Sequence, residues 1–168
     1  MEKFDVYDKN GNKTGRIKTD SDEFTGDEYI LGSSLWLVNK SGELLIQKRS
    51  MTKTRFPGMW SITGGAAKAG ETSEQACLRE VAEEIGLRLS LNDITLLYRT
   101  FGSNIIFDDY VCIMDFLLSS AILQVEEVSE IKFAGINEIK EMFFGGTFLI
   151  NDITDLDKVS AYIQNIKS

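Results

Sequence analysis

The apolar residues of this chain fall into short runs separated by polar turns, a pattern typical of β-strands. Asn10-Gly11 lies between two such runs and favours a hairpin over residues 4–18 with a type I′ turn. Polar residues 19–28 are expected to form a connecting loop. Further predicted strands cover residues 29–39 and 42–50 as a second antiparallel pair, then 60–63 ending at Gly64-Gly65, 93–103, 105–118 and 129–136.

A helical period begins after Thr72. This residue is a good N-cap, with Gln75 three positions on to complete a capping box, and Gly86 is a good stop signal. Between them the apolar residues recur at about 100° per residue and predict one buried face, formed by Cys77, Leu78, Val81, Ala82 and Ile85. A short helix is predicted over 137–144 and a C-terminal helix over 152–167.

These elements predict an α/β (α+β) fold in which a mixed β-sheet is flanked by a few helices. A chain of 168 residues without a linker or a repeat is expected to form a single domain over 1–168. Within it, residues 1–28 form the N-terminal hairpin and loop, and residues 51–60 form a basic loop that contains the only proline, Pro57.

The charge balance narrows the class of partner. There are 18 basic and 26 acidic residues, a net charge of −8. Such a surface argues against nonspecific binding of nucleic acid or of an anionic membrane, which need basic surface. It allows a phosphate-bearing small molecule, provided that a cation mediates the contact.

The rare residues exclude several chemistries. The chain has no histidine, which rules out a Ser-His-Asp triad, a Cys-His pair and a histidine-ligated metal site. Its two cysteines, Cys77 and Cys112, form no CxxC motif and are expected to be buried apolar residues. The polar first residues resemble no secretory signal, and no apolar run approaches the ~20 residues of a membrane span, so we expect a cytoplasmic protein.

Three carboxylates stand out on the predicted helix. Glu80, Glu83 and Glu84 fall opposite its apolar face, where like charges repel by a few tenths of a kcal/mol per pair. They are expected to converge toward one point beyond the helix surface. Carboxylate oxygens are the ligands that Mg²⁺ and Mn²⁺ prefer, although spacing alone is also compatible with a solvated, glutamate-rich face.

The wider pattern resembles the box of the Nudix hydrolases, G-x5-E-x7-R-E-U-x-E-E-x-G-U with U aliphatic. Gly65, Glu71, Arg79 and the residues that follow match every fixed position over the 23 residues 65–87. The resemblance extends over residues 30–145 through "GELLIQKRS", "PGMW" and "SEIKFAGINEI". It implies a Nudix fold, with a mixed sheet sandwiched between helices, and Mg²⁺- or Mn²⁺-dependent hydrolysis of a nucleoside diphosphate linked to another moiety.

The resemblance also implies roles for individual residues. Glu80, Glu83 and Glu84 would be the metal ligands, joined by the Gly65 carbonyl and, as an auxiliary ligand, by Glu71. Arg79 would orient the carboxylates. A carboxylate must also take a proton from the attacking water. We favour Glu80 for this step. The loop before residue 131 offers three further glutamates, Glu126, Glu127 and Glu130, and among these we favour Glu127 and Glu130.

Residues for substrate binding are expected outside the box. The basic loop and the strand before it offer Lys48, Arg49, Lys53 and Arg55 for phosphate groups, among which Arg49 and Arg55 are favoured. Aromatic residues can either stack on a base or pack in the core, and the candidates are Phe56, Trp60, Phe101, Phe107 and Tyr110.

Two alternatives remain beside the hydrolase. The segments "DVYDKNGNKTG" and "LLIQKRSMTKTRFPGMW" resemble the isopentenyl-diphosphate isomerase-like branch of the same superfamily. That isomerase requires a cysteine upstream of the box and histidine ligands, and "WSITGG" has neither. The other alternative is a non-catalytic sensor of a nucleotide metabolite, but such modules usually lose box carboxylates and this chain has them all. A homodimer in which the N-terminal hairpin packs across subunits is compatible with the sequence.

Overall fold

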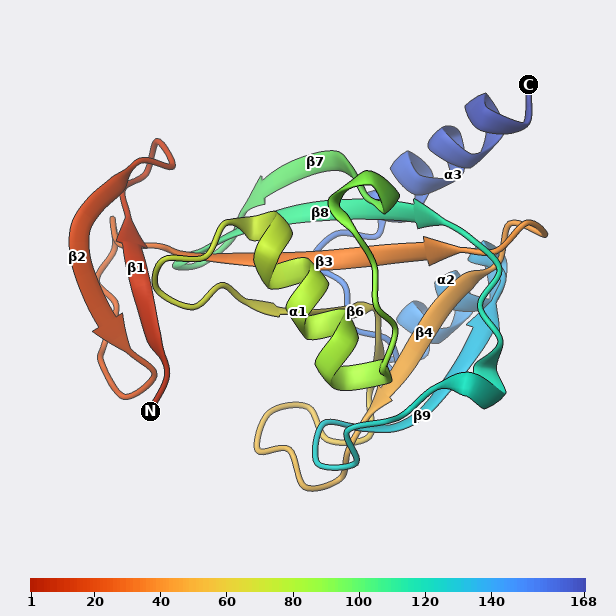
Figure 1. Ribbon diagram of the computed structural model, residues 1–168, viewed down its shortest axis with the longest axis horizontal. Helices are drawn as coiled ribbons and strands as arrows, with labels where there is room; N and C mark the ends of the chain where they lie inside the picture. The colour runs from red at the N-terminus through yellow and green to blue at the C-terminus, as the bar shows by residue number, and fades with distance from the viewer.

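The fold is a split, mixed β-sheet with helices on both faces, as the computed structural model shows for all 168 residues (Figure 1). The predicted α+β class is confirmed. The strand order in the main sheet is β5-β4-β3-β8-β7, with β6 beside β3 and β9 beside β4. These strands are β3 (Ile30–Val38), β4 (Leu44–Arg49), β5 (Trp60–Ser61), β6 (Thr63–Ala66), β7 (Thr95–Phe101), β8 (Ile105–Ile113) and β9 (Val128–Ala134).

The sheet is split because β3 and β4 diverge. The predicted pairing of these two strands holds only at the turn, where Val38 faces Leu44. Beyond it β3 pairs with β6 on this side, while β4 pairs with β5 and with β9. On its other side β3 runs parallel to β8 over its whole length, from Ile30↔Ile105 to Val38↔Ile113. The opening between the two halves therefore lies beside the Gly64-Gly65 segment.

Helix α1 (Ser73–Ile85) covers one face of the sheet (Figure 1). Its predicted caps are confirmed: Thr72 accepts from the Gln75 N–H, Gln75 accepts from the Thr72 N–H, and Gly86 takes the left-handed conformation with φ 74°. Cys77, Val81 and Ile85 pack against strand residues of this face, among them Leu35, Leu37, Leu45, Tyr110 and Cys112. The capped amphipathic segment is thus fixed both locally and by burial.

The opposite face is covered by α2 (Ile136–Phe144) and α3 (Thr154–Lys167). Both helices lie where the sequence pattern predicts them. Ile139 of α2 and Leu156 and Val159 of α3 are buried against Trp36, Ile46 and their neighbours. The sheet is therefore sandwiched between helices, as expected.

The N-terminal hairpin is a separate two-stranded sheet at one end of the molecule, made of β1 (Lys3–Tyr7) and β2 (Lys13–Thr19) (Figure 1). The hairpin is confirmed, but the type I′ turn is wrong. That turn needs positive φ at both central residues, and here Gly11 has φ 80° while Asn10 does not. Asp8 closes a longer loop instead, since its carboxylate accepts from the N–H groups of Asn10 and Asn12.

Two strand ends also differ from the prediction. The predicted strand 105–118 stops at Ile113, because the register with β3 ends there and a short 3-10 helix, Leu118–Ser120, follows. The predicted strand 60–63 is divided into β5 and β6, and β6 runs through Gly64-Gly65 to Ala66 because these glycines pair with Ser33 and Ser34. A side chain at position 64 would lie 2.4 Å from the Ser33 carbonyl. None of the helices is both long and apolar enough to cross a membrane.

Glu28 links the hairpin to the start of β3 and makes an acid-sensitive contact. Its carboxylate accepts from Lys18, from the Thr25 N–H at 3.0 Å and from Arg16. The hydrogen bond from Lys18, followed by that from Thr25, holds the pKa of Glu28 at about 2, below its ordinary value of 4.5. A carboxyl group whose pKa is lower in the folded than in the unfolded protein stabilises the fold at pH values above its unfolded pKa. This contribution disappears as the pH falls from about 4.5 toward 2.

We predict that Glu28→Gln lowers the free energy of unfolding at pH 7 and that its difference from the wild type shrinks between pH 4.5 and 2. Urea unfolding at a series of pH values measures this difference. Glu23→Gln is the control, because the Glu23 side chain forms no ion pair. A Glu28→Gln difference that stays constant across this range would contradict the assignment.

Candidate active site

The box loop and the first turns of α1 bring a glycine and a carboxylate into direct contact. Gly65 lies on β6, and Glu80 lies on the helix face above it. A Cβ at position 65 would meet the Glu80 carboxylate carbon at 2.5 Å and its oxygens at 2.6 and 2.8 Å. Only glycine therefore lets Glu80 rest on the strand backbone at this point.

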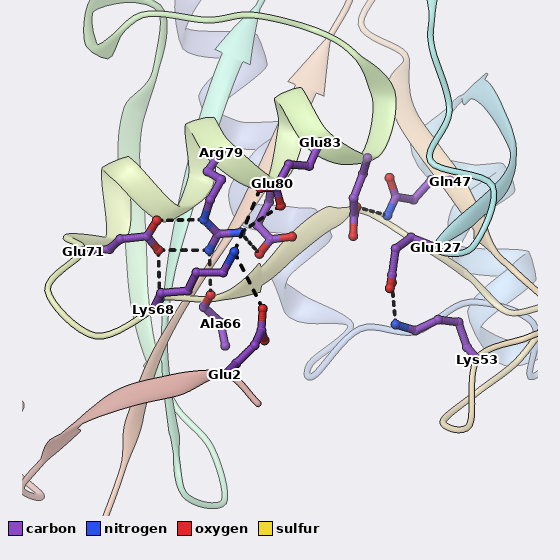
Figure 2. Close-up of polar contacts among 11 residues, drawn as sticks. Glu2, Gln47, Lys53, Ala66, Lys68, Glu71, Arg79, Glu80, Glu83 and Glu127 are labelled. Carbon is purple, nitrogen blue, oxygen red and sulfur yellow. Dashed lines mark hydrogen bonds and ion pairs between the residues drawn. The ribbon is translucent and has the colours of Figure 1, made fainter. Parts of the chain in front are cut away.

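Arg79 is the centre of the box (Figure 2). Its Nε and Nη2 donate to the two oxygens of Glu71 at 2.7 and 3.0 Å, and Nη2 also donates to the Ala66 carbonyl at 3.0 Å. Its Nη1 donates to Glu80 at 2.6 Å and to Glu83 at 3.1 Å. One guanidinium thus joins the loop, the strand and the helix, which is the orienting position that the sequence predicts for it.

This network sets the charge state of its members. The hydrogen bond that Arg79 donates to Glu71 is the largest cause of the raised pKa of Arg79, so the guanidinium stays charged. Burial alone would raise the pKa of Glu71, but hydrogen bonds from Arg79 and the Lys68 N–H outweigh it, and the pKa is lowered. For Glu80 burial prevails over Arg79 and raises the pKa.

Glu84 does not lie on a solvated face, which was the alternative left open by its spacing; it is buried, with 7% of its surface exposed. It points toward the opening of the sheet, where Gln47 on β4 donates to it at 2.6 Å. The Thr63 hydroxyl in turn donates to the Gln47 amide oxygen at 2.8 Å. Burial raises the pKa of Glu84 to about 7, against the lowering effect of Gln47. Gln47 was not a candidate, because nothing local marks a strand glutamine that faces a helix.

The expected convergence of three carboxylates on one point is wrong for the side chains as they stand. No group of three acidic residues surrounds a common point in the structure. The reason is that Arg79 lies between Glu80 and Glu83, while Glu84 turns to Gln47. Glu83 is the most exposed of the three, with 47% of its side chain accessible, and also lies 4.0 Å from Lys68.

The candidate bases Glu127, just before β9, and Glu130, on β9, are separated by the sheet. Glu127 lies on the side of the box and is paired with Lys53 of the basic loop (Figure 2). The Glu126 carbonyl accepts from the Thr52 hydroxyl, so this segment and the basic loop are tied together. Glu130 is not brought to the box: it is paired in register with Lys48, and both side chains lie on the face opposite to α1.

The predicted phosphate-binding residues differ in whether their cationic groups are already engaged by other parts of the protein. Arg49 donates to the backbone carbonyls of Arg55 and Phe56 and so holds the basic loop in shape. Lys48 lies over the Trp60 ring, 5.9 Å from its centroid, on the far face of the sheet. Arg55 is exposed on the loop and forms no ion pair. Of the three, Arg55 alone has a cationic group that is not engaged by another part of the protein.

A cavity of about 400 Å³ lies in the opening of the sheet. Aromatic and apolar residues line it together with polar groups from β3, β4 and β8 and from the start of α3; its members include Ser34, Trp36, Gln47, Arg49, Phe56, Gly64, Phe107, Asp109, Ile150 and Asp155. Ser34 donates to Asp109 inside it. The sequence pointed only to Arg49, Phe56 and Phe107 here, because Ser34 and Asp109 are 75 residues apart.

The remaining candidates have structural roles. Cys77 and Cys112 are buried as expected. Trp60 packs at the edge of the core, Phe101 is half exposed against Tyr29, and the Tyr110 hydroxyl is paired with Ser73. None of these three aromatic residues lines the cavity.

A family model described as the NUDIX domain matches residues 29–147. The chain belongs to the Nudix family. An uncharacterized Nudix hydrolase of Listeria monocytogenes is 34% identical over 151 residues, which are 89% of either protein. An isopentenyl-diphosphate Δ-isomerase of Salmonella heidelberg is 32% identical over 117 residues, 65% of this chain and 64% of that protein.

The solved structures show the shared Nudix fold. DR0079 from Deinococcus radiodurans aligns with a TM-score of 0.76 at 22% identity, covering 92% of this chain and 96% of that one. The NUDIX domain of Shewanella oneidensis NrtR, solved with ADP-ribose, aligns with a TM-score of 0.66 at 17% identity, covering 87% and 94%. The family identifies this chain as a hydrolase acting on diphosphate bonds, and Nudix hydrolases use divalent metal ions.

We predict that Gly65→Ala lowers the rate of diphosphate hydrolysis by at least about tenfold, because the added methyl group must displace Glu80 and small misplacements of catalytic groups are costly. Gly26→Ala is the matched control, since a Cβ there has no neighbour within 4 Å. Both rates are measured on the same substrate, and thermal unfolding checks that each variant is folded. A folded Gly65→Ala protein with wild-type turnover would contradict the role of this contact.

Proposed function

We propose that this Nudix protein is a Mg²⁺- or Mn²⁺-dependent pyrophosphohydrolase that cleaves a nucleoside diphosphate linked to another moiety by attack of water on phosphorus. The observation that carries this proposal is the complete set of box carboxylates gathered on α1 and its loop around Arg79. Because the chain has no histidine, the acid–base step must use a carboxylate, another side chain or a metal-bound water.

The donor set fits a hard divalent cation. All the candidate ligands are oxygen atoms, from Glu80, Glu83 and Glu84, with Glu71 as an auxiliary and the Gly65 carbonyl beside them. The close approach of the Glu80 carboxylate to Gly65 supports a shared ligand set of the two residues. Glu83 can turn toward an ion because it is half exposed and its bond to Arg79 is the longest of that group. When bound, the cation supplies a water of lowered pKa and neutralises charge on the phosphate oxygens.

The protein supplies positioning and a proton acceptor. Arg79 keeps Glu71, Glu80 and the box loop in fixed relation, so the carboxylates are oriented before the substrate arrives. Glu80 is our first choice for the proton acceptor, and Glu127 is the second because it lies on the same side of the sheet. To act as a base, Glu127 must first leave Lys53, whose ammonium group then becomes available for a phosphate oxygen.

The isomerase activity of the Salmonella relative is not proposed here. Neither cysteine lies on the strand before the box, and both thiols are packed between α1 and the sheet. Burial raises the pKa of Cys77 to about 12 and that of Cys112 to about 11, so both remain protonated and inert.

We predict that Glu83→Gln lowers metal-dependent turnover by orders of magnitude and leaves the fold intact, because Glu83 is a surface ligand that supports no core contact. The assay is a screen of nucleoside diphosphate derivatives with Mg²⁺ or Mn²⁺, with products identified by mass. Glu74→Gln, on the same helix but outside the Arg79 network, is the control. A Glu83→Gln protein with near-full activity would refute the ligand assignment.

Metal binding also predicts a change in stability that needs no substrate. A cation that binds only the folded state raises the unfolding temperature. We expect Mg²⁺ or Mn²⁺ to raise it for the wild type and for Glu74→Gln, and to raise it less for Glu83→Gln. Equal increases of the unfolding temperature in all three proteins would show that the metal does not bind at Glu83. Metal binding with tight nucleotide affinity but no hydrolysis of any compound would favour the sensor function instead.

A further inference from the structure

The cavity in the opening of the sheet is adjacent to the box, on the other side of the strand that carries Gly64 and Gly65. Ser34, Trp36 and Asp109 reach it from the face that carries α2 and α3, because they alternate along β3 and β8 with residues that face α1. Gln47 lines the cavity and also donates to Glu84, and Gly64 lines it next to Gly65. A molecule in the cavity therefore has a short path to the box carboxylates.

The inner end of the cavity is acidic and nearly closed to water. Asp109 has 7% of its surface exposed and Asp155 has 4%. One oxygen of Asp109 accepts from Ser34, and one oxygen of Asp155 accepts from Lys158 at 2.8 Å. Two further polar groups lie beside this pair, the Trp36 indole N–H next to Asp109 and the Tyr98 hydroxyl next to Asp155.

Polar atoms around these carboxylates lack partners. The Nε1 of Trp36 and the hydroxyl of Tyr98 are buried beside these carboxylates and form no hydrogen bond of standard geometry. Burial raises the pKa of Tyr98, and nearby Asp109 and Asp155 raise it further, which places this hydroxyl in the same cluster. Buried polar atoms without partners are rare in folded proteins and commonly mark a place where another molecule completes the set.

The charge of the cavity decides which part of a substrate it accepts. Its only cationic lining residue is Arg49, and that guanidinium is engaged by the carbonyls of Arg55 and Phe56. A phosphate group would meet the Asp109 carboxylate, and the ammonium group of Lys158 is already paired with Asp155. A flat, uncharged group with N–H donors has matching partners, since Phe56 and Phe107 offer apolar walls and Asp109 offers an acceptor.

We propose that this cavity holds the base of the nucleotide substrate and that Asp109 selects bases with an exocyclic amino group. A volume of about 400 Å³ is within the range of small-molecule sites. The amino group donates to Asp109, whereas a carbonyl oxygen at the same position would oppose the carboxylate oxygen. This inference rests on the proposed function, because it places the diphosphate of the same molecule at the box.

The test compares substrates that differ at this one position. Hydrolysis is measured for ADP-ribose against its inosine counterpart, and for CDP-glucose against UDP-glucose. We expect the wild type to prefer the amino-bearing member of each pair by at least about tenfold in kcat/KM, the size of one hydrogen bond to a charged group. Asp109→Asn should reduce this preference mainly through KM, because the amide can present a donor to the carbonyl base.

Asp157→Asn is the matched control, since Asp157 lies on the same helix as Asp155 but on the surface, paired with Lys140. It should keep the wild-type preference. Binding of AMP and IMP to the wild-type protein, measured by equilibrium dialysis, requires no variant and covers a failure of Asp109→Asn to fold. We expect AMP to bind more tightly by a similar factor.

The outcomes separate this inference from the proposed function. Efficient hydrolysis without preference, or with preference for the inosine and uridine members, overturns the base assignment and leaves the hydrolase in place. Absence of hydrolysis together with selective binding of AMP overturns the hydrolase and supports the cavity as a base site. Equal binding of AMP and IMP by the wild type overturns the base site.

Discussion

The guanidinium of Arg79 is the interaction on which the site depends. Three carboxylates and one backbone carbonyl, from the box loop, β6 and α1, are held by a single planar group. Glutamates this close would repel one another and splay apart without a cation between them. Because the arginine is charged at every accessible pH, the box keeps its shape before any metal or substrate is present.

The split in the sheet determines where the box and the cavity lie relative to each other. Since β3 and β4 part after Val38 and Leu44, the Gly64-Gly65 segment lies in the opening with the box on one side and the cavity on the other. Both sides are acidic, but in different ways. The carboxylates on α1 are balanced by Arg79 and Lys68 and are the proposed ligands of a divalent cation, whereas Asp109 and Asp155 are buried at a cavity with no uncommitted cationic side chain in its lining.

Much of the fold could be predicted from the sequence because its signals are local. The caps of α1 are set by hydrogen bonds within four residues, and the helices over 136–144 and 154–167 follow from their periodicity. The errors arose where a competing side chain or a partner strand decides. A local Asn-Gly signal was overridden by the Asp8 carboxylate, and β8 ended at Ile113 because its partner β3 ended there.

The sequence by itself determined the family of this protein: the complete box identifies a Nudix hydrolase, and the absence of histidine excludes every histidine-dependent mechanism. Tertiary structure alone decided which carboxylates meet and which are separated. Gln47 and Glu84 are 37 residues apart in the chain and Ser34 and Asp109 are 75 apart, yet both pairs are in contact. Glu130 is only three residues from Glu127 but faces the other side of the sheet. Such pairings follow from strand register and from the two faces of a sheet, which depend on the whole set of strand contacts and not on any local pattern.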